Sequence, residues 1–362
     1  GKQMPVELVR NLFESNPWCF PALERAAERI RDALGDFQNI STALHTLLRS
    51  DHGIAVQILP VETMPVWRKR YDRHSQRLFV SERLSRSEQM ELLAQELVML
   101  REASLLDEEV ELLKIDGDEA IRLTRFELAR YTALAILMPY DRFLRTAERV
   151  AHDLPILCRR YGVNFTQVAQ RLVSLQDKSG NRRGGLEFFM MEVDEGGNVL
   201  RRLGSRGFPV SQFGGQCPKL ALHASFASPG NMMCERVVNP QGDVYLTLSC
   251  TVDGVSVGAG ERRKRTAVLL GIEDKVSRSI LAASQDDRSG KTRAASASED
   301  VLNRTIANAR QLPHPLNLVP VSIGPSCRLC ERTDCIARSA PPVTRPLGLD
   351  DLVQGFGAYG LT

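Results

Sequence analysis

No apolar run in this 362-residue sequence approaches the ~20 residues that a membrane-spanning helix needs. The first residues, GKQMPVELVR, also lack the apolar core of a signal peptide. We therefore expect a cytoplasmic protein with no membrane partner. In that reducing compartment, eight cysteines are poor candidates for disulfides, so a tight group of them would indicate metal or redox chemistry.

The sequence also lacks a marked excess of either charge. Its net charge is +3, and 43% hydrophobic with 25% charged residues is ordinary for a soluble globular protein. A surface dedicated to coating nucleic acid would need a larger basic excess. Because the chain is longer than the ~100–200 residues of a typical domain, we expect two domains.

Motifs of the common enzyme classes are missing. No GxGxxG follows a strand and no GxxxxGK[ST] occurs, which argues against these two nucleotide-binding sites. A zinc peptidase helix would read HExxH, but here Gln95 and Met99 flank Glu96, and neither replaces an imidazole ligand. The histidines are scattered, at His45, His52, His74, His152, His223 and His314. We expect no enzyme, and the alternative is a zinc hydrolase that uses Glu96 with an unrecognised ligand set.

The first half of the chain is mainly helical in pattern. Apolar residues at helical spacing predict helices over 22–34, 37–50, 87–102, 118–138 and 141–153. Strand patterns occur at Gly53–Leu59 and Arg77–Ser81. We predict a mostly helical domain over residues 1–178.

The segment Leu154–Leu175 predicts two short helices around Gly162, with Asn164 as the cap of the second. Such a pair is compatible with a helix-turn-helix, although a small helical pair is more often plain packing. A DNA-binding module with a zinc-stabilised tail is therefore a second alternative.

From Gly185 the pattern changes to the alternation typical of strands. The runs LEFFMMEV and VLRRL, joined by DEGGN, predict a hairpin, and DVYLTLSCTV and TAVLLGI predict further strands. We predict an α+β domain over residues 179–362, built on a mainly antiparallel sheet. The polar stretch 284–300 reads as a flexible loop within it.

Three cysteines fall within nine residues near the C-terminus, with the spacing C-x2-C-x4-C: Cys327, Cys330 and Cys335. The Gly324-Pro325 turn before them allows their sulfurs to face one centre, and a metal site normally needs a fourth ligand. Cys217 follows a Gly-Gly pair and precedes a proline, so it lies in a loop setting from which a sulfur can turn toward a metal. We favour it over Cys234.

The spacing leaves the nature of the site open. Iron–sulfur clusters and structural zinc both use C-x2-C pairs, and unliganded or redox thiols are the third reading. Arg328, Arg332 and Arg338 would offset the charge of an anionic cluster, or they are ordinary solvated loop residues.

Several separated segments resemble known families. The helix with QELVML, followed by ELARYTALAILMP, resembles a degenerate ImmA/IrrE-type metallopeptidase domain. The segments CPKLALHASFASPG, RRKRTAVLLGI and IGPSCRLCERTDCIARSAPP resemble the C-terminal domain of the short-chain fatty acyl transcriptional regulators. This resemblance implies a 4Fe–4S cluster on Cys217, Cys327, Cys330 and Cys335, and coenzyme A or a short-chain acyl-CoA as the effector.

The family also implies partners. Its members contact promoter DNA through an N-terminal helix-turn-helix domain, which we expect to be absent from this chain, and we expect a homo-oligomer. The sequence would then be the effector-sensing part of a regulator of short-chain fatty acid (propionate/methylcitrate) metabolism.

Residues for the phosphates of coenzyme A are less well defined, because phosphates need arginines or backbone N–H groups in a suitable loop. The segment RRLGSRG offers Arg201, Arg202 and Arg206, and a second basic run includes Arg263. His223, beside the Cys217 loop, completes the predicted ligand-binding set.

Overall fold

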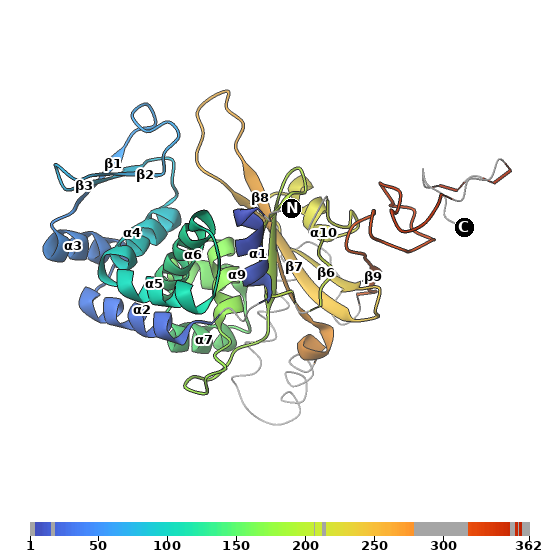
Figure 1. Cartoon of the computed structure of the whole chain (residues 1–362), viewed down its shortest axis with the longest axis horizontal. Coiled ribbons are helices and arrows are strands. Elements are labelled where there is room, and N and C mark those ends of the chain that lie inside the picture. Colours follow the sequence, from blue (N-terminus) through green and yellow to red (C-terminus); the bar gives the residue numbers. More distant parts are fainter. Residues whose placement is uncertain are drawn as a thin grey trace. The chain divides into compact units, whose positions relative to one another are not determined.

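The computed structural model describes residues 4–15, 19–205, 207–211, 215–278 and 318–347, together with 352, 353, 355 and 356 (Figure 1). Two compact units form: unit 1 comprises Gly1–Gly185 and Asp253–Lys264, and unit 2 comprises Leu186–Val252 and Arg265–Thr362. The predicted loop 284–300 lies outside the described residues.

Unit 1 is mainly helical. Its helices are α1 (Pro5–Ser15), α2 (Pro21–Leu34), α3 (Ile40–His52), α4 (Arg86–Arg101), α5 (Ala103–Leu112), α6 (Asp118–Leu137), α7 (Tyr140–Arg149), α8 (Leu154–Tyr161) and α9 (Phe165–Ser174). The predicted helices are all present, whereas α1 and α5 were not predicted.

Local hydrogen bonds explain where several helices begin. Asn39 accepts from two backbone N–H groups of α3. Ser85 with Glu88 forms a capping box at α4, and Asn164 with Gln167 forms one at α9. Each box satisfies N–H groups that have no partner within the helix. The cap predicted at Asn164 is confirmed.

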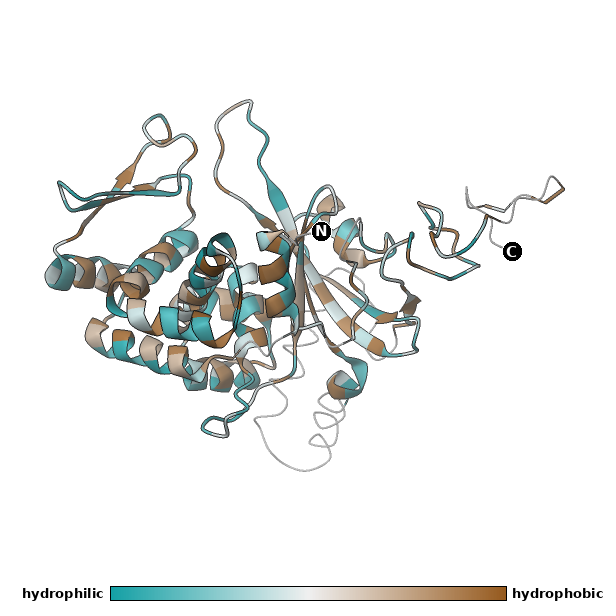
Figure 2. Ribbon diagram, in the orientation of Figure 1, coloured by the Kyte–Doolittle hydropathy of each residue, from teal (hydrophilic) through white to brown (hydrophobic). Residues whose placement is uncertain are grey.

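The second half of α6 is the centre of unit 1. Every residue from Tyr131 to Leu137 is buried, and α6 packs against α1, α2, α4 and α5. The surrounding helices carry apolar and polar faces, seen as brown and teal in Figure 2. Because this half of α6 is covered on several sides, its sequence, YTALAIL, has no strongly polar face.

A small mixed sheet also belongs to unit 1. Its strands are β1 (Ala55–Leu59), β2 (Lys69–Asp72) and β3 (Arg77–Ser81), in the order β1-β3-β2. β1 pairs in parallel with β3, and β2 pairs antiparallel with it. The short, mostly exposed β2 was not predicted, because KRYD has no alternating apolar pattern.

Unit 2 is built on a six-stranded sheet with the order β5-β4-β8-β7-β6-β9. Its strands are β4 (Phe189–Asp194), β5 (Val199–Leu203), β6 (Met233–Val238), β7 (Val244–Asp253), β8 (Arg265–Glu273) and β9 (Val321–Ser322). The predicted β4–β5 hairpin forms, with Glu192 opposite Arg201. Of the pairings with a defined register, only β6 with β9 is parallel, so the sheet is mainly antiparallel as expected.

The buried face of β7 is the more polar one. Tyr245, Thr247 and Ser249 are buried, whereas the alternating Val and Leu residues are only partly buried. The Tyr245 ring packs edge-on against Phe189 and Phe208, with ring centroids 5.6 and 5.4 Å apart. This aromatic group holds that face of the strand in the core.

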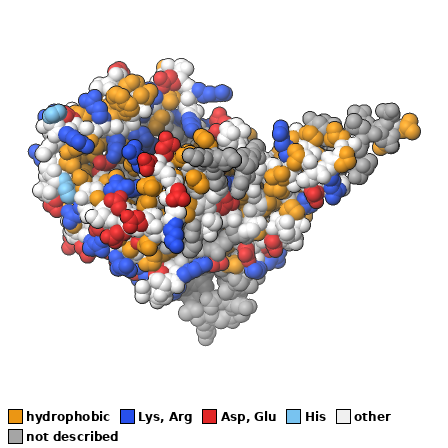
Figure 3. All heavy atoms as spheres, viewed as in Figure 1, with side chains coloured by type: hydrophobic (Ala, Val, Ile, Leu, Met, Phe, Trp, Pro, Cys, Tyr) orange, Lys and Arg blue, Asp and Glu red, His pale blue; other side chains and the backbone are white. Residues whose placement is uncertain are grey.

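The chain after β9 is drawn in red in Figure 1 and continues as turns, without a further helix or strand in its described part. Across the described residues, no helix is long and apolar enough to cross a membrane. Basic and acidic side chains are intermixed on the face drawn in Figure 3, in keeping with the small net charge.

Candidate functional site

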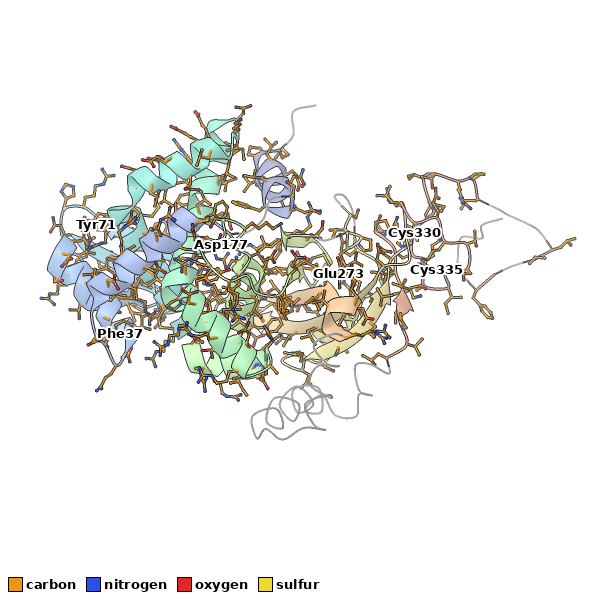
Figure 4. All side chains as sticks on the ribbon, turned by 90° about the horizontal axis from the view of Figure 1, so that it is seen from below. Phe37, Tyr71, Asp177, Glu273, Cys330 and Cys335 are labelled. Atoms are coloured by element: carbon orange, nitrogen blue, oxygen red, sulfur yellow. The ribbon has the colours of Figure 1, made fainter. Side chains whose placement is uncertain are left out.

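The three clustered cysteines lie in the loop that follows β9, and Figure 4 labels two of them, Cys330 and Cys335. Short-range backbone bonds fold this loop: Leu329 N–H donates to Ser326 O at 3.1 Å, and Arg338 N–H donates to Cys335 O at 3.3 Å. Cys330 is buried at 8% exposure, while Cys327 and Cys335 are half-buried.

Cys217 approaches this loop from a distant part of the sequence. It lies in the loop before α10 (Ala221–Ala224) and is buried at 7% exposure beside Leu220 and Ile323. The backbone N–H of Gly324 hydrogen-bonds to its sulfur. Gly324 also touches Cys330, because a Cβ added to it would lie 2.6 Å from Cys330 Sγ. The two cysteines therefore flank the same glycine.

Electrostatic interactions connect Cys217 to the other two cysteines as well. Burial raises the pKa of Cys217, nearby Cys327 and Cys335 raise it further, and N–H donors from Gly324 and Lys219 oppose this. Cys217 thus lies in the same region of unit 2 as the cysteine loop. The choice of Cys217 over Cys234 as a ligand stays a prediction.

Cys327 differs from the other thiols in its surroundings. Burial alone would raise its pKa, but hydrogen bonds from Ser339 and Ala340 and the charge of Arg338 lower it. The Ser339 N–H and hydroxyl each lie 3.4 Å from Cys327 Sγ. This environment favours the thiolate, the form of cysteine that binds metals.

Arg338 holds the cysteine loop together from inside. Only 6% of it is exposed, and its guanidinium donates to three carbonyls: Cys327 O at 2.8 Å, Cys330 O at 2.9 Å and Arg332 O at 2.5 Å. No ion pair to a carboxylate occurs for it within the described residues. A buried cation without a carboxylate is costly unless an anion lies close by.

The described residues contain no group of three or more His, Cys, Asp or Glu side chains arranged to hold a single metal ion. In a four-iron cluster each thiolate binds a different iron, so its ligands stand farther apart than four thiolates on one zinc. The four thiols are donors of the kind that such a cluster uses, and the cluster itself stays a prediction.

The remaining cysteines lie elsewhere. Cys234 and Cys250 are buried at 8% exposure in β6 and β7, and burial raises the pKa of Cys234 to about 12. In Cys19, burial beside Glu24 raises the pKa to about 12. Cys158 is half-buried on α8. These thiols have the surroundings of small core residues.

The predicted phosphate-binding arginines do not form one described group. Arg201 and Arg202 lie on β5, and Arg202 is only 3% exposed with its guanidinium donating to Ser211 O at 3.3 Å. Arg263 lies in the Asp253–Lys264 segment of unit 1, paired with Asp253 at 3.2 Å. Arg206 falls outside the described residues. Their role toward an effector stays a prediction.

His223 lies on α10, next to the cysteine site. Its ring hydrogen-bonds to the backbone of Cys217, and its buried Nε2 has no hydrogen-bond partner among the described residues. Burial lowers its pKa, so the neutral imidazole is favoured. The histidine therefore supports the Cys217 loop in this structure.

A cavity of about 580 Å³ opens beside Cys330 and was not predicted from the sequence. Its lining comes from the segment after β5, the β6–β7 turn and the cysteine loop, including Phe208, Val210, Pro240 and Leu329. Its size is in the range of small-molecule sites. Because its walls come from three distant loops, no local motif could have revealed it.

Glu96, which stands where a zinc peptidase helix has its HExxH glutamate, forms an ion pair. Glu96 on α4 pairs with the Lys69 ammonium from β2. Gln95 donates its side-chain N–H to Phe126 O at 3.5 Å, and Met99 Sδ lies 3.4 Å from Arg125 Nη1. These contacts occupy the three positions that carry HExxH in a zinc peptidase, and they offer no histidine ligand.

The helix-turn-helix alternative requires an exposed recognition helix, and α9 is not exposed. Every residue of α9 is buried, including polar Gln167, Gln170 and Arg171. A recognition helix has to expose side chains to base edges in the major groove. Helix α9 is instead part of the core of unit 1.

Comparison with known proteins matches the helical first half and the sheet-containing second half of the chain to two different domain families. The profile of the IrrE N-terminal-like domain matches residues 49–173. The profile of the short-chain fatty acyl coenzyme A regulator C-terminal domain matches residues 175–299 and 297–359. The chain belongs to the short-chain fatty acyl coenzyme A regulator family.

Curated relatives of this regulator are transcriptional regulators. RamB of Mycobacterium tuberculosis is 30% identical over 352 residues, covering 96% of this chain and 68% of RamB. PrpR of the same organism is 28% identical, covering 100% and 68%. The propionyl-CoA carboxylase regulator of Cereibacter sphaeroides is 29% identical, covering 98% and 69%. A solved Mycobacterium tuberculosis transcriptional regulator matches with a TM-score of 0.81 and 28% identity, over 99% of this chain and 100% of that one.

Proposed function

We propose that this chain is the effector-sensing part of a non-enzymatic regulator of short-chain fatty acyl metabolism. It carries a 4Fe–4S cluster on Cys217, Cys327, Cys330 and Cys335 and responds to coenzyme A or a short-chain acyl-CoA. Family membership and the names of the relatives support regulation of propionate metabolism in the cytoplasm, with promoter DNA as the partner of the full regulator.

The observation that carries the cluster proposal is that Cys217 and Cys330 flank Gly324, while Cys327 and Cys335 lie near enough to Cys217 to raise its pKa. Cys217 hydrogen-bonds to the Gly324 N–H, and Cys330 lies against the Gly324 Cα. Arg338 supplies a buried positive charge beside them. A cluster bound by four thiolates is anionic, so this charge would lower the cost of burying it.

The bound cluster would supply four iron–thiolate links between the Cys217 loop and the C-terminal segment. The residues of the chain prepare this connection. The N–H groups of Lys219 and Gly324 orient Cys217, Ser339 orients Cys327, and Arg338 fixes the carbonyls of the loop between them.

The cavity beside Cys330 supports the effector proposal. Its apolar residues suit the pantetheine arm or a short acyl chain, and it begins at Gly207, where the basic segment RRLGSRG ends. An effector held there would touch the cysteine loop through Leu329 and Cys330. Effector binding would then bias how subunits of a homo-oligomer associate, provided the ligand prefers one assembly.

Anaerobic purification with iron, sulfide and zinc analysis tests the cluster. We expect about four irons and four sulfides per chain, with broad absorbance near ~400 nm. Cys217→Ser should lose most of this iron. Cys234→Ser, a buried cysteine of unit 2 away from the loop, is the matched control and should retain it. About one zinc without sulfide would refute the cluster.

Binding of propionyl-CoA and of free coenzyme A, measured by calorimetry, tests the effector proposal. Val210→Trp would fill the cavity and should weaken binding at least about tenfold, while Val343→Trp, at an exposed site, should not. If Val210→Trp bound the effector with unchanged affinity, the effector site would not be this cavity. If saturating ligand changed neither oligomeric state nor melting temperature, the association mechanism would fail.

A further inference from the structure

A second cavity, of about 680 Å³, lies within unit 1 and is lined by five arginines. It is formed by the end of α2, the α2–α3 loop, α7 and α8, and its lining contains no acidic residue. The arginines are Arg31, Arg142, Arg145, Arg149 and Arg160. Three of them stand at positions i, i+3 and i+7 of α7, which brings them onto one face of that helix.

The part of the chain that the structure describes supplies no carboxylate partner for four of these arginines. Within the described residues, Arg142, Arg145, Arg149 and Arg160 form no ion pair. The two acids of α7 are engaged elsewhere, Asp141 with Arg182 and Glu148 with Arg183. The cavity thus gathers four unpaired cations in addition to Arg31.

The pKa of Arg31 reflects the positive charge gathered in this cavity. Burial lowers its pKa, and the charge of Arg142 lowers it further. Its guanidinium is fixed by Ile136 O at 2.5 Å and stacks over the Phe37 ring at 5.0 Å, so it cannot turn away. Two cations held close together without a carboxylate favour an anion between them.

The aromatic residues of the cavity are positioned as well. Phe37, labelled in Figure 4, lies in the α2–α3 loop beneath Arg31. The Tyr161 hydroxyl donates to Thr146 Oγ1 at 3.1 Å, which keeps its ring at the wall. Arginines provide forked donors for phosphate oxygens, and the rings provide a flat apolar surface.

We propose that this cavity binds a small molecule with two or more phosphate groups. A concave site of this volume suits a metabolite better than a macromolecular backbone. The cavity is built from residues of unit 1 and the cysteine loop from residues of unit 2, so this proposal does not depend on the proposed cluster. Free polyphosphate or nucleotide and the phosphates of coenzyme A share this chemistry, and the experiment separates them.

Titration of the intact protein with inorganic pyrophosphate, followed by calorimetry at low and high salt, tests the proposal. We expect binding that weakens with salt. The double variant Arg145→Gln, Arg149→Gln should lose at least about tenfold in affinity. Arg159→Gln removes an exposed arginine of α8 that does not line the cavity, so it should leave the affinity unchanged.

Competition with coenzyme A and with ATP identifies the source of the phosphate, and displacement of pyrophosphate by either supports the site. Three results would overturn the proposal. One is no pyrophosphate binding by the wild type. Another is an equal loss in Arg159→Gln, which would indicate a diffuse basic surface. The third is duplex DNA binding that the double variant abolishes and pyrophosphate does not displace.

Discussion

The buried ion pair between Glu24 and Arg171 leads to a quantitative prediction for the stability of unit 1. Glu24 is 2% exposed and Arg171 is 1% exposed. Two guanidinium nitrogens contact the two carboxylate oxygens at 2.7 and 2.9 Å, and Tyr131 donates to Glu24 at 2.5 Å. Arg171 Nε also donates to Met138 O at 2.8 Å, so the pair connects α2, α6 and α9.

The substitution Arg171→Met removes the cation and leaves the Glu24 carboxylate buried, with the Tyr131 hydroxyl as a remaining donor. Burial opposes the charge of Arg171, but the adjacent Glu24 outweighs this and raises the pKa of Arg171, so the guanidinium stays charged. Breaking such a pair costs about 3–5 kcal/mol. The double variant Glu24→Gln, Arg171→Met leaves no orphan charge and should lose clearly less.

Urea unfolding followed by tryptophan fluorescence measures this effect, because both tryptophans, at positions 18 and 67, belong to the sequence range 1–185 that makes up most of unit 1. With an m-value of about 2 kcal/mol/M, the midpoint of Arg171→Met should fall by roughly 1.5–2.5 M. Arg29→Met is the control: its pair with Glu102 leaves Arg29 56% exposed, so the loss should stay below about 1 kcal/mol. A loss below about 1 kcal/mol in Arg171→Met, or a double variant worse than the single, would refute the reasoning.

Three further predictions concern single residues. Burial raises the pKa of Glu235 to about 7, so the folded state holds this proton more tightly than the unfolded state. Its contribution is present at acidic pH and is lost as the pH rises through 7, lowering the free energy of unfolding by about 3 kcal/mol. The Ala221 N–H donates to the Glu235 side chain at 2.7 Å, and Glu235→Gln keeps an acceptor for it. In calorimetric melts between pH 5 and 8, this variant should no longer lose stability as the pH rises. If its pH profile equals that of the wild type, other groups cause the pH dependence. Gly324→Ala should displace Cys330 and reduce the amount of bound iron. Gly258→Ala, with open space around it, is the control and should not. Equal iron in both variants would show that Gly324 is not part of the metal site. Glu96→Gln should change stability by less than about 1 kcal/mol in urea, because its partner Lys69 is 45% exposed, and should leave zinc content unchanged; loss of bound zinc would revive the hydrolase alternative.

Local patterns in the sequence were sufficient for most of the secondary structure. Apolar spacing and caps such as Asn164 define the helices of unit 1, since they depend on neighbours within a few residues. The β4–β5 hairpin follows from alternation around DEGGN for the same reason. The spacing of Cys327, Cys330 and Cys335 and the loop setting of Cys217 were likewise readable in the sequence, as was the absence of an HExxH helix.

Tertiary structure decided which of these residues meet. Cys217 reaches Gly324 across more than a hundred residues, and Arg338 becomes buried only when the cysteine loop folds around it. The burial of α9 and of the polar face of β7 depends on what packs against them, which periodicity does not specify. The arginine cavity brings together α2, α7 and α8. Such sites arise from long-range packing, whereas a sequence pattern reports only the preferences of one segment.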